Sequence, residues 1–295
     1  MIRTIAKPFL GIFFLGMMLV LLPARAQAQS SWQWQMSLKV DAPNSMYLPG
    51  AVAFDPASER YYVVDAGHNR LVSFARDGKM LRAFTAEDRL KAPFDMVRLD
   101  DGKLWVVEKG RNSLTLIDVA AKVVKPHTLR DGKRQIFPDR IAHAGGRLYV
   151  LDRASGQVLR LASDLSVDQR YGCPDCLGGF ADFVLAGDTV WALDPLGKKI
   201  FRFNADGAIA KTVNLGDEVD FPVSLAVEET ENIYVLDRHQ NSVLAYSQDG
   251  RFRYRFLSSG HAQGQVHFAR QLRFDPWGRL CVVDEGGGRV EIFSR

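Results

Sequence analysis

The side chains best suited to chemistry are three carboxylates and two histidines at corresponding places along the chain. Asp95, Asp139 and Asp182 each stand near the start of a strand-like apolar segment, and carboxylate oxygens gathered in this way could hold a divalent cation. His68 and His239 each follow such a segment, but they are one residue out of register and no third histidine joins them. Catalytic zinc usually takes three protein ligands, so a carboxylate site is better supported than a histidine site.

Cys173 and Cys176 stand in the sequence Cys-Pro-Asp-Cys within a glycine-rich connector. Haem attachment would need a histidine directly after the second cysteine, where Leu177 stands, and a tetrahedral zinc site would need a second pair of ligands. We expect a small disulfide that pins the connector, with a thiol-redox role as the alternative. Cys281 lies in an apolar strand pattern and is expected to be a buried free thiol.

The first residues have the pattern of a secretory leader. Two basic residues precede an apolar run from Pro8 to Leu22, and Ala26 to Ala28 offers a small-residue cleavage site. The run is shorter than the roughly 20 apolar residues of a membrane-spanning helix. We therefore predict a signal peptide over residues 1–28, a periplasmic or extracellular location, and a mature chain that does not span a membrane.

The net charge of the chain bears on which classes of partner it could bind. The formal net charge is +4, part of it lies in the leader, and no block of lysine or arginine follows. A nearly neutral mature chain of this kind gives no electrostatic support for binding nucleic acid. The sequence also has no Gly-x-Ser-x-Gly nucleophile elbow and no phosphate-binding loop.

One short phrase, a few β-forming residues followed by an acid, recurs along the whole chain. Its acids stand 42 to 47 residues apart, a period typical of propellers and solenoids. A carboxylate at a strand end can accept backbone N–H groups from the adjoining turn, so we interpret the repeated acids as structural. They are Asp65, Glu108, Asp152, Asp194, Asp237 and Asp284.

Each repeat contains four strand-length apolar patches separated by turn residues, which predicts a four-stranded antiparallel meander. A meander has two apolar faces, and six of them stacked around an axis bury both. The last repeat supplies only three strands, so residues 32–38, which alternate apolar with mostly polar side chains, are expected to complete it. The predicted fold is an all-β six-bladed β-propeller over residues 29–295, with blades at about 48–86, 90–130, 136–172, 178–216, 220–258 and 266–295.

Two stretches carry a resemblance to a known family. Leu48 to Asp55 followed by Tyr62 to Leu71 resembles the NHL repeat, and the fifth repeat shows the same pattern at Phe221 to Val227 and Ile233 to Asp237. The chain is thus similar to exported bacterial NHL-repeat propellers. Among propellers of this general type, amidating lyases hold zinc through histidines and gluconolactonase-like proteins hold a divalent cation through carboxylate and amide groups.

The meander also predicts where a binding site would lie. The loop before each innermost strand and the loop after each second strand emerge at the same end of the ring, so their residues should gather at one mouth of the channel. Solvated loop charge and ligand binding are both open interpretations of this set. It comprises Asp95, Asp139, Arg140, Asp182, Arg270, Gln271, His68, Arg153 and His239.

We expect a non-enzymatic binding or scaffold propeller without a cofactor that holds a protein, peptide or glycan at this mouth. The alternative is a metal-dependent lyase or lactone hydrolase in which Asp95, Asp139 and Asp182, with His68 or His239, hold the metal. A third possibility is a component of an exported assembly, with the Cys173 to Cys176 connector as a docking feature.

Overall fold

The computed structural model describes residues 1, 2, 31–228 and 232–295. The expected leader and its cleavage site lie outside these residues, apart from Met1 and Ile2. No helix in the described part is both long and apolar enough to cross a bilayer. Export therefore stays a prediction from the sequence.

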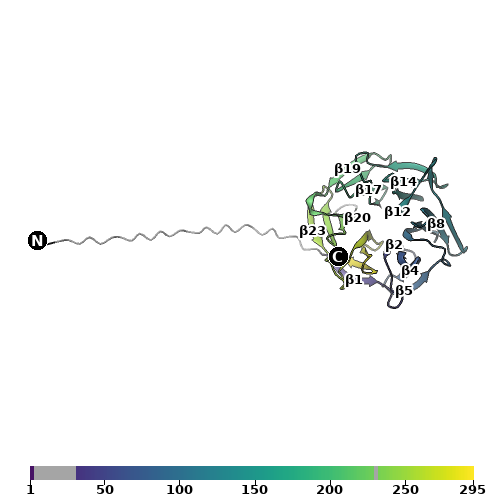
Figure 1. The fold of residues 1–295 in the computed structure, drawn as a ribbon, viewed down its shortest axis with the longest axis horizontal. Helices are drawn as coiled ribbons and strands as arrows, with labels where there is room; N and C mark the ends of the chain where they lie inside the picture. Colours follow the sequence, from purple (N-terminus) through teal and green to yellow (C-terminus); the bar gives the residue numbers. More distant parts are fainter. Residues whose placement is uncertain (3–30, 229–231) are drawn as a thin grey trace.

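Six four-stranded antiparallel sheets follow one another around a ring (Figure 1), which confirms the predicted six-bladed β-propeller. Each of the first five blades takes four strands in chain order from the innermost to the outermost. The strands of blades one to three are β2 (Pro49–Asp55), β3 (Arg60–Asp65), β4 (Arg70–Ala75) and β5 (Met80–Phe84); β6 (Pro93–Arg98), β7 (Leu104–Glu108), β8 (Ser113–Asp118) and β9 (Val123–His127); and β12 (Pro138–Ala144), β13 (Arg147–Asp152), β14 (Gln157–Leu161) and β15 (Val167–Tyr171).

The remaining blades repeat this order, except that the last one uses both ends of the sequence. Blade four contains β16 (Asp182–Ala186), β17 (Thr189–Asp194), β18 (Lys199–Phe203) and β19 (Ile209–Asn214). Blade five contains β20 (Pro222–Val227), β21 (Asn232–Asp237), β22 (Ser242–Ser247) and β23 (Phe252–Phe256), and blade six contains β24 (Ala269–Phe274), β25 (Leu280–Asp284), β26 (Arg289–Ser294) and β1 (Gln33–Leu38).

Strand β1 closes the ring as the outer strand of blade six, as the sequence predicted. It pairs antiparallel with β26, with Trp34 opposite Phe293 and Leu38 opposite Val290. The Trp34 indole donates a hydrogen bond of 2.6 Å to the Glu291 carboxylate, which fixes the register from the side chains as well. The outer edge of β26 is thereby paired, so no seam is left open beside it.

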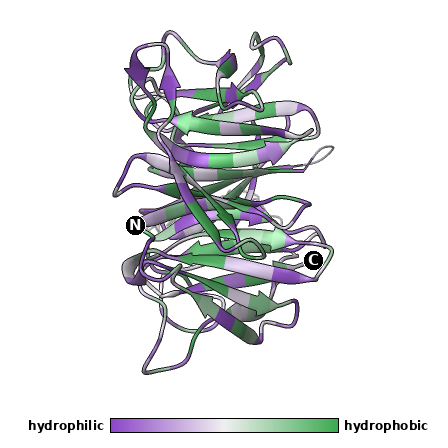
Figure 2. Cartoon of the chain, turned by 90° about the vertical axis from the view of Figure 1, so that its right-hand side faces the viewer, coloured by the Kyte–Doolittle hydropathy of each residue, from purple (hydrophilic) through white to green (hydrophobic). Residues whose placement is uncertain are grey.

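The core lies between neighbouring blades, where apolar strand faces meet (Figure 2). Between blades six and one, Val283 and Val290 contact the same buried cluster as Val63 and Val72. Cys281 lies in this cluster as a fully buried free thiol, as expected, and burial raises the pKa of that thiol well above its ordinary value. It therefore serves as a core residue.

The six repeated acids are buried, and all except Asp194 tie adjacent loops together. The Asp65 carboxylate accepts the backbone N–H of Tyr47 at 2.8 Å, and the Asp284 carboxylate accepts that of His267 at 2.7 Å. Asp152 and Asp237 likewise accept backbone N–H groups from two loops each. These contacts support the structural interpretation of the repeated acids.

Two local features were not expected. A small hairpin, β10 (Arg130–Asp131) with β11 (Arg134–Gln135), extends the connection between blades two and three. Short 3-10 turns cover Ala66–His68 and Gly216–Glu218. Neither changes the course of the innermost strands, which position the site described next.

Candidate functional site

The six innermost strands each present one side chain at the same height in the channel. Each of these positions pairs with the residue just before a repeated acid; Asp95, for example, pairs with Val107 and Asp182 with Leu193. In five blades a register shift directly precedes the position. We call this set the inner layer: Ala51, Asp95, Arg140, Asp182, Ser224 and Gln271.

The inner layer satisfies backbone N–H groups that have no neighbouring strand to bond. Asp95 accepts the N–H of Met96 at 2.9 Å with one oxygen and that of Ile141, in the next blade, at 3.1 Å with the other. Asp182 does the same for Phe183 at 2.9 Å and Leu225 at 3.3 Å. Each aspartate thus links two blades. It also supplies an acceptor to buried N–H groups, which would be costly to leave without a partner.

The two remaining N–H groups of this layer are held by neutral side chains. The Gln271 amide oxygen accepts the N–H of Val52 at 2.9 Å, and the Ser224 hydroxyl accepts that of Leu272 at 3.0 Å. The side chains of Ala51 and Arg140 cannot accept a hydrogen bond. The N–H groups that face them from the next blades, on Met96 and Phe183, are accepted by Asp95 and Asp182 instead. Together with the bonds from Gln271 to Asp95 and from Arg273 to Asp182, these contacts connect the innermost strands of all six blades in one network across the channel.

Asp182 has a dedicated counter-ion. The Arg273 guanidinium donates to both of its oxygens, at 2.8 and 2.9 Å, although the two residues are 91 positions apart in the chain. Burial opposes ionisation of Asp182, but the Arg273 charge and hydrogen bonds, together with Arg140, hold the pKa of this carboxyl below its ordinary value. The Ser224 hydroxyl donates a further short hydrogen bond to it.

Asp95 lacks such a partner. Besides the two N–H groups, its only described donor is the Gln271 amide, at 3.3 Å. Burial raises the pKa of the Asp95 carboxyl, since Arg140 and Arg273 act on it only through their charge. The two aspartates therefore differ in charge environment despite their equivalent positions.

Above the inner layer, at the end of the ring where the blades are connected, three cations surround one aromatic ring. The Phe94 centroid lies 4.0 Å from the Arg270 guanidinium carbon, 4.2 Å from the Lys109 ammonium nitrogen and 5.1 Å from the Arg140 guanidinium carbon. Arg238 lies 5.6 Å from the ring of Phe268. We call Lys109, Arg140, Arg153, Arg238 and Arg270 the cationic mouth.

Two acids neutralise only part of the cationic mouth. Asp139 pairs with Lys109 through a short contact, and Glu285 pairs with Arg270 and, at 2.5 Å, with Arg238. Burial lowers the pKa of Lys109, and the positive charges of Arg153 and Arg140 lower it further. Burial also lowers the pKa of Arg270, and the charges of Arg140 and Arg238 lower it further. Positive charge is therefore in excess here.

Arg140 forms the floor of the cationic mouth and is only 4% exposed. Its Nε and Nη1 atoms are buried, and no described residue accepts a hydrogen bond from either. The nearest carboxylate oxygen, on Asp182, lies 3.8 Å from Nε and already receives Arg273. A buried guanidinium with unused donors favours an anionic ligand above it.

The other residues of the predicted site lie in the loops of the same end. His68 and His239 are exposed; His68 contacts the Asp65 carboxylate at 3.0 Å, and His239 stacks on Phe221 with 4.5 Å between ring centroids. Arg153 is also exposed. By contrast, Asp95, Arg140, Asp182 and Gln271 lie inside strands and are buried, rather than in mouth loops as expected.

The residues expected to hold a metal do not fit that role in this arrangement. The oxygens of Asp95 and Asp182 accept backbone N–H groups and, for Asp182, a guanidinium, while Asp139 pairs with Lys109. Within the described residues no three histidine, cysteine or acidic side chains are grouped to bind a cation. A metal would have to displace several of these donors.

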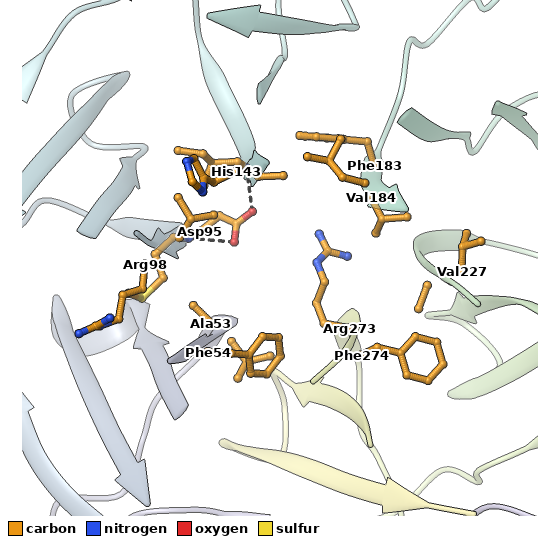
Figure 3. A pocket seen from close by; sticks show the side chains of 17 residues that line it. Ala53, Phe54, Asp95, Arg98, His143, Phe183, Val184, Val227, Arg273 and Phe274 are labelled. Atoms are coloured by element: carbon orange, nitrogen blue, oxygen red, sulfur yellow. Dashed lines mark hydrogen bonds between the residues drawn. The ribbon is translucent and has the colours of Figure 1, made fainter. Parts of the chain in front are cut away.

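Below the inner layer lies an axial cavity of roughly 330 Å³ (Figure 3). Apart from Asp95, which belongs to the inner layer, its lining residues come after the inner-layer positions in each innermost strand, so it lies toward the end of the ring opposite the cationic mouth. The half-buried side chains of Phe54, Arg98 and His143 lie along its rim. The sequence predicted no site at this end.

The cysteine connector has the expected bond. Cys173 and Cys176 form a disulfide with 5.3 Å between their Cα atoms. Beside it, Leu177 and Leu196 are largely exposed. Among the described residues the disulfide lies beside Leu196, Lys199 and Phe201 of blade four, so it is a feature separate from the cationic mouth.

Sequence reasoning missed several residues that the structure brings into the site. Arg273 stands between Leu272 and Phe274, and a lone cation inside an apolar strand pattern was the available signal. Phe94 directly precedes Asp95 and resembled core. Glu285 directly follows the repeated acid Asp284, and nothing in the surrounding sequence indicates that it belongs to a site.

No protein-family model matches the chain, and no curated protein matches its sequence. Solved structures do match its fold. A streptogramin B lyase is 11% identical, with a TM-score of 0.64 over 89% of this chain and 97% of that one. A virginiamycin B lyase from Staphylococcus aureus is 13% identical, with a TM-score of 0.61 over 90% and 99% of the two chains.

A gluconolactonase from Xanthomonas campestris is also similar, at 16% identity and a TM-score of 0.65 over 84% of this chain and 86% of that one. Likeness at such identities shows the fold alone. The chain is a six-bladed β-propeller whose structural neighbours include lyases and a gluconolactonase. Membership of the NHL-repeat family stays a prediction.

Proposed function

We propose that this propeller is a non-enzymatic binding protein that holds an acidic segment of a partner protein in the cationic mouth. The observation that carries the proposal is Arg140, a buried guanidinium with two nitrogens that no described residue accepts from. Carboxylates bind guanidinium groups through paired hydrogen bonds, and the surrounding lysine and arginines would stabilise the same negative charge.

The surroundings of the mouth favour a protein or peptide over a glycan. Tyr47, Phe221 and Phe268 are 58%, 41% and 45% exposed, and each lies in a loop that leads to an innermost strand at the same end of the ring. Aromatic and arginine side chains are enriched at the centres of protein interfaces. An acidic peptide with an apolar residue would use both kinds of contact.

The test is fluorescence anisotropy with labelled hexaglutamate, hexaserine and hexalysine peptides. Hexaglutamate should bind and the other two should not. Arg270→Gln should weaken hexaglutamate binding about tenfold, the effect of losing roughly 1.4 kcal/mol. Arg251→Gln is the matched control, since Arg251 is an exposed arginine paired with Asp249 on an outer hairpin.

Equal binding of all three peptides, or equal weakening by both arginine variants, would contradict a specific acidic site. An oligouronate that bound more tightly than hexaglutamate would identify the ligand as a glycan. We also propose that the protein is exported, because a disulfide such as that between Cys173 and Cys176 persists in oxidising compartments. Cell fractionation followed by N-terminal sequencing would test it.

The alternative is a metal-dependent lyase or lactone hydrolase, and the fold neighbours favour it. Against it stands the use of the axial carboxylates by backbone N–H groups and Arg273. Elemental analysis of protein purified without chelators or a histidine tag separates the two. One divalent ion per chain would favour the enzyme, whereas binding of hexaglutamate by metal-free protein would favour the binding protein.

A further inference from the structure

The axial cavity is separated from the cationic mouth by the inner layer and has different chemistry. Apolar and polar atoms both line it: Phe54 and Phe274, half-buried side chains of two different blades, lie with Val184 and Val227 beside charged groups such as Arg98 and Arg273. At roughly 330 Å³ its volume is at the lower end of the range for small-molecule sites. These dimensions suit a molecule with a single ring.

Among the polar groups of the cavity, Arg273 has donor capacity left. Arg273 uses Nη1 and Nη2 for Asp182, at 2.9 and 2.8 Å, and Nη1 also donates to the Leu272 carbonyl at 2.9 Å. No described residue accepts from its Nε, and the side chain is 17% exposed. Figure 3 shows the guanidinium among Phe183, Val184 and Phe274, inside the cavity.

The charges around the cavity favour an uncharged ligand. Asp182 balances Arg273, and Asp55 balances Arg98 at 3.0 Å. Asp95 remains without a direct ion pair, so an anion in the cavity would be repelled by it, while a cation would be repelled by Arg273. A carbonyl oxygen can accept from a guanidinium N–H without adding charge.

We propose that the axial cavity binds a small uncharged molecule that has a flat apolar body and one carbonyl oxygen, with the oxygen directed at Arg273. This site is independent of the acidic ligand proposed for the cationic mouth. The ring would lie against the aromatic walls, where apolar burial supplies most of the affinity. The hydrogen bond to Arg273 would fix the orientation.

The test uses ligand-observed NMR titrations of the full chain with four one-ring probes: acetophenone, toluene, benzoate and benzylamine. Acetophenone should bind about tenfold more tightly than toluene, because toluene lacks the acceptor. Benzoate and benzylamine should bind more weakly than acetophenone. Similar affinities for all four probes, or no binding of acetophenone at millimolar concentration, would overturn the proposal.

Two cavity-filling variants locate the site. Val184→Trp should weaken acetophenone binding at least tenfold. Val227→Phe, in the adjacent blade, should have the same effect. Two variants are used so that the test still works if one of them does not fold. Val119→Trp is the matched control, since Val119 is 56% exposed in the turn between β8 and β9. Unchanged binding in folded Val184→Trp or Val227→Phe protein would exclude the cavity, whatever the result with hexaglutamate.

Discussion

Asp95 and Asp182 occupy equivalent positions two blades apart, and both accept one backbone N–H from their own strand and one from the next blade. They differ in what faces them across the channel. Asp182 receives both nitrogens of Arg273, whereas Asp95 receives only the Gln271 amide. The pKa of Asp182 is lowered and that of Asp95 is raised as a result.

The comparison shows that position in the repeat fixes the backbone role of these side chains but not their charge. The charge is set by single residues from other blades, which do not repeat. Variants at the two aspartates can therefore separate the shared backbone role from the individual ion pair.

The largest effect is expected for Asp182→Asn. The amide would leave the Arg273 guanidinium buried without a counter-ion, and breaking a buried pair in this way costs about 3–5 kcal/mol. The free energy of unfolding, measured by urea titration followed by tryptophan fluorescence, should fall by this amount.

A double-mutant cycle with Arg273→Met controls for general damage. Removing both partners should cost clearly less than the sum of the single changes. Additive losses would show that Asp182 stabilises the protein through its backbone contacts alone.

A smaller effect is expected for Ser224→Ala. The change leaves the buried N–H of Leu272 without its acceptor, which costs about 1–3 kcal/mol. Ser73, a partly buried serine on strand β4 whose hydroxyl donates to the Arg82 carbonyl, provides the matched control through Ser73→Ala. An equal, small change in the two variants would contradict the proposed role of the inner layer.

Asp95→Asn should change stability least, by about 1 kcal/mol or less. The amide loses one accepted N–H, but it also removes a buried charge that has no direct counter-ion. Urea titration at neutral pH is again the measurement. A loss as large as that of Asp182→Asn would mean that the ion pair with Arg273 is not what distinguishes the two sites.

The pH dependence should have opposite signs at the two aspartates. Because the pKa of Asp182 is lowered on folding, its stabilising contribution is present above about pH 4 and is lost as the pH falls through the folded value. Because the pKa of Asp95 is raised, its contribution is full below about pH 4 and is lost as the pH rises through the folded value.

Subtracting each asparagine variant from the parent protein isolates these contributions. The difference in unfolding free energy should rise with pH for Asp182→Asn as the pH approaches about 4 from below, and it should fall with pH for Asp95→Asn above about pH 4. Slopes of the same sign would show that the two carboxylates titrate alike.

The sequence predicted the ring, the closing strand and the backbone role of the repeated acids, because these depend on periodicity and local turn chemistry. It also identified Asp95, Arg140, Asp182 and Gln271 as variable positions of one repeat site. It could not show that these side chains lie within the channel, since that depends on the register shift before each position. The sequence could not identify Arg273 as the partner of Asp182, because the two residues are 91 positions apart and only closure of the ring brings them together.

The pairing of β1 with β26 has a consequence for synthesis. The ribosome completes β1 first and β26 last, so blade six cannot assemble until the chain has left the ribosomal tunnel. During that time β1, with the apolar side chains of Trp34, Met36 and Leu38, is a strand without its partner. A chain exported before it folds would close its ring only after crossing the membrane, and the cell would need to protect this strand until then.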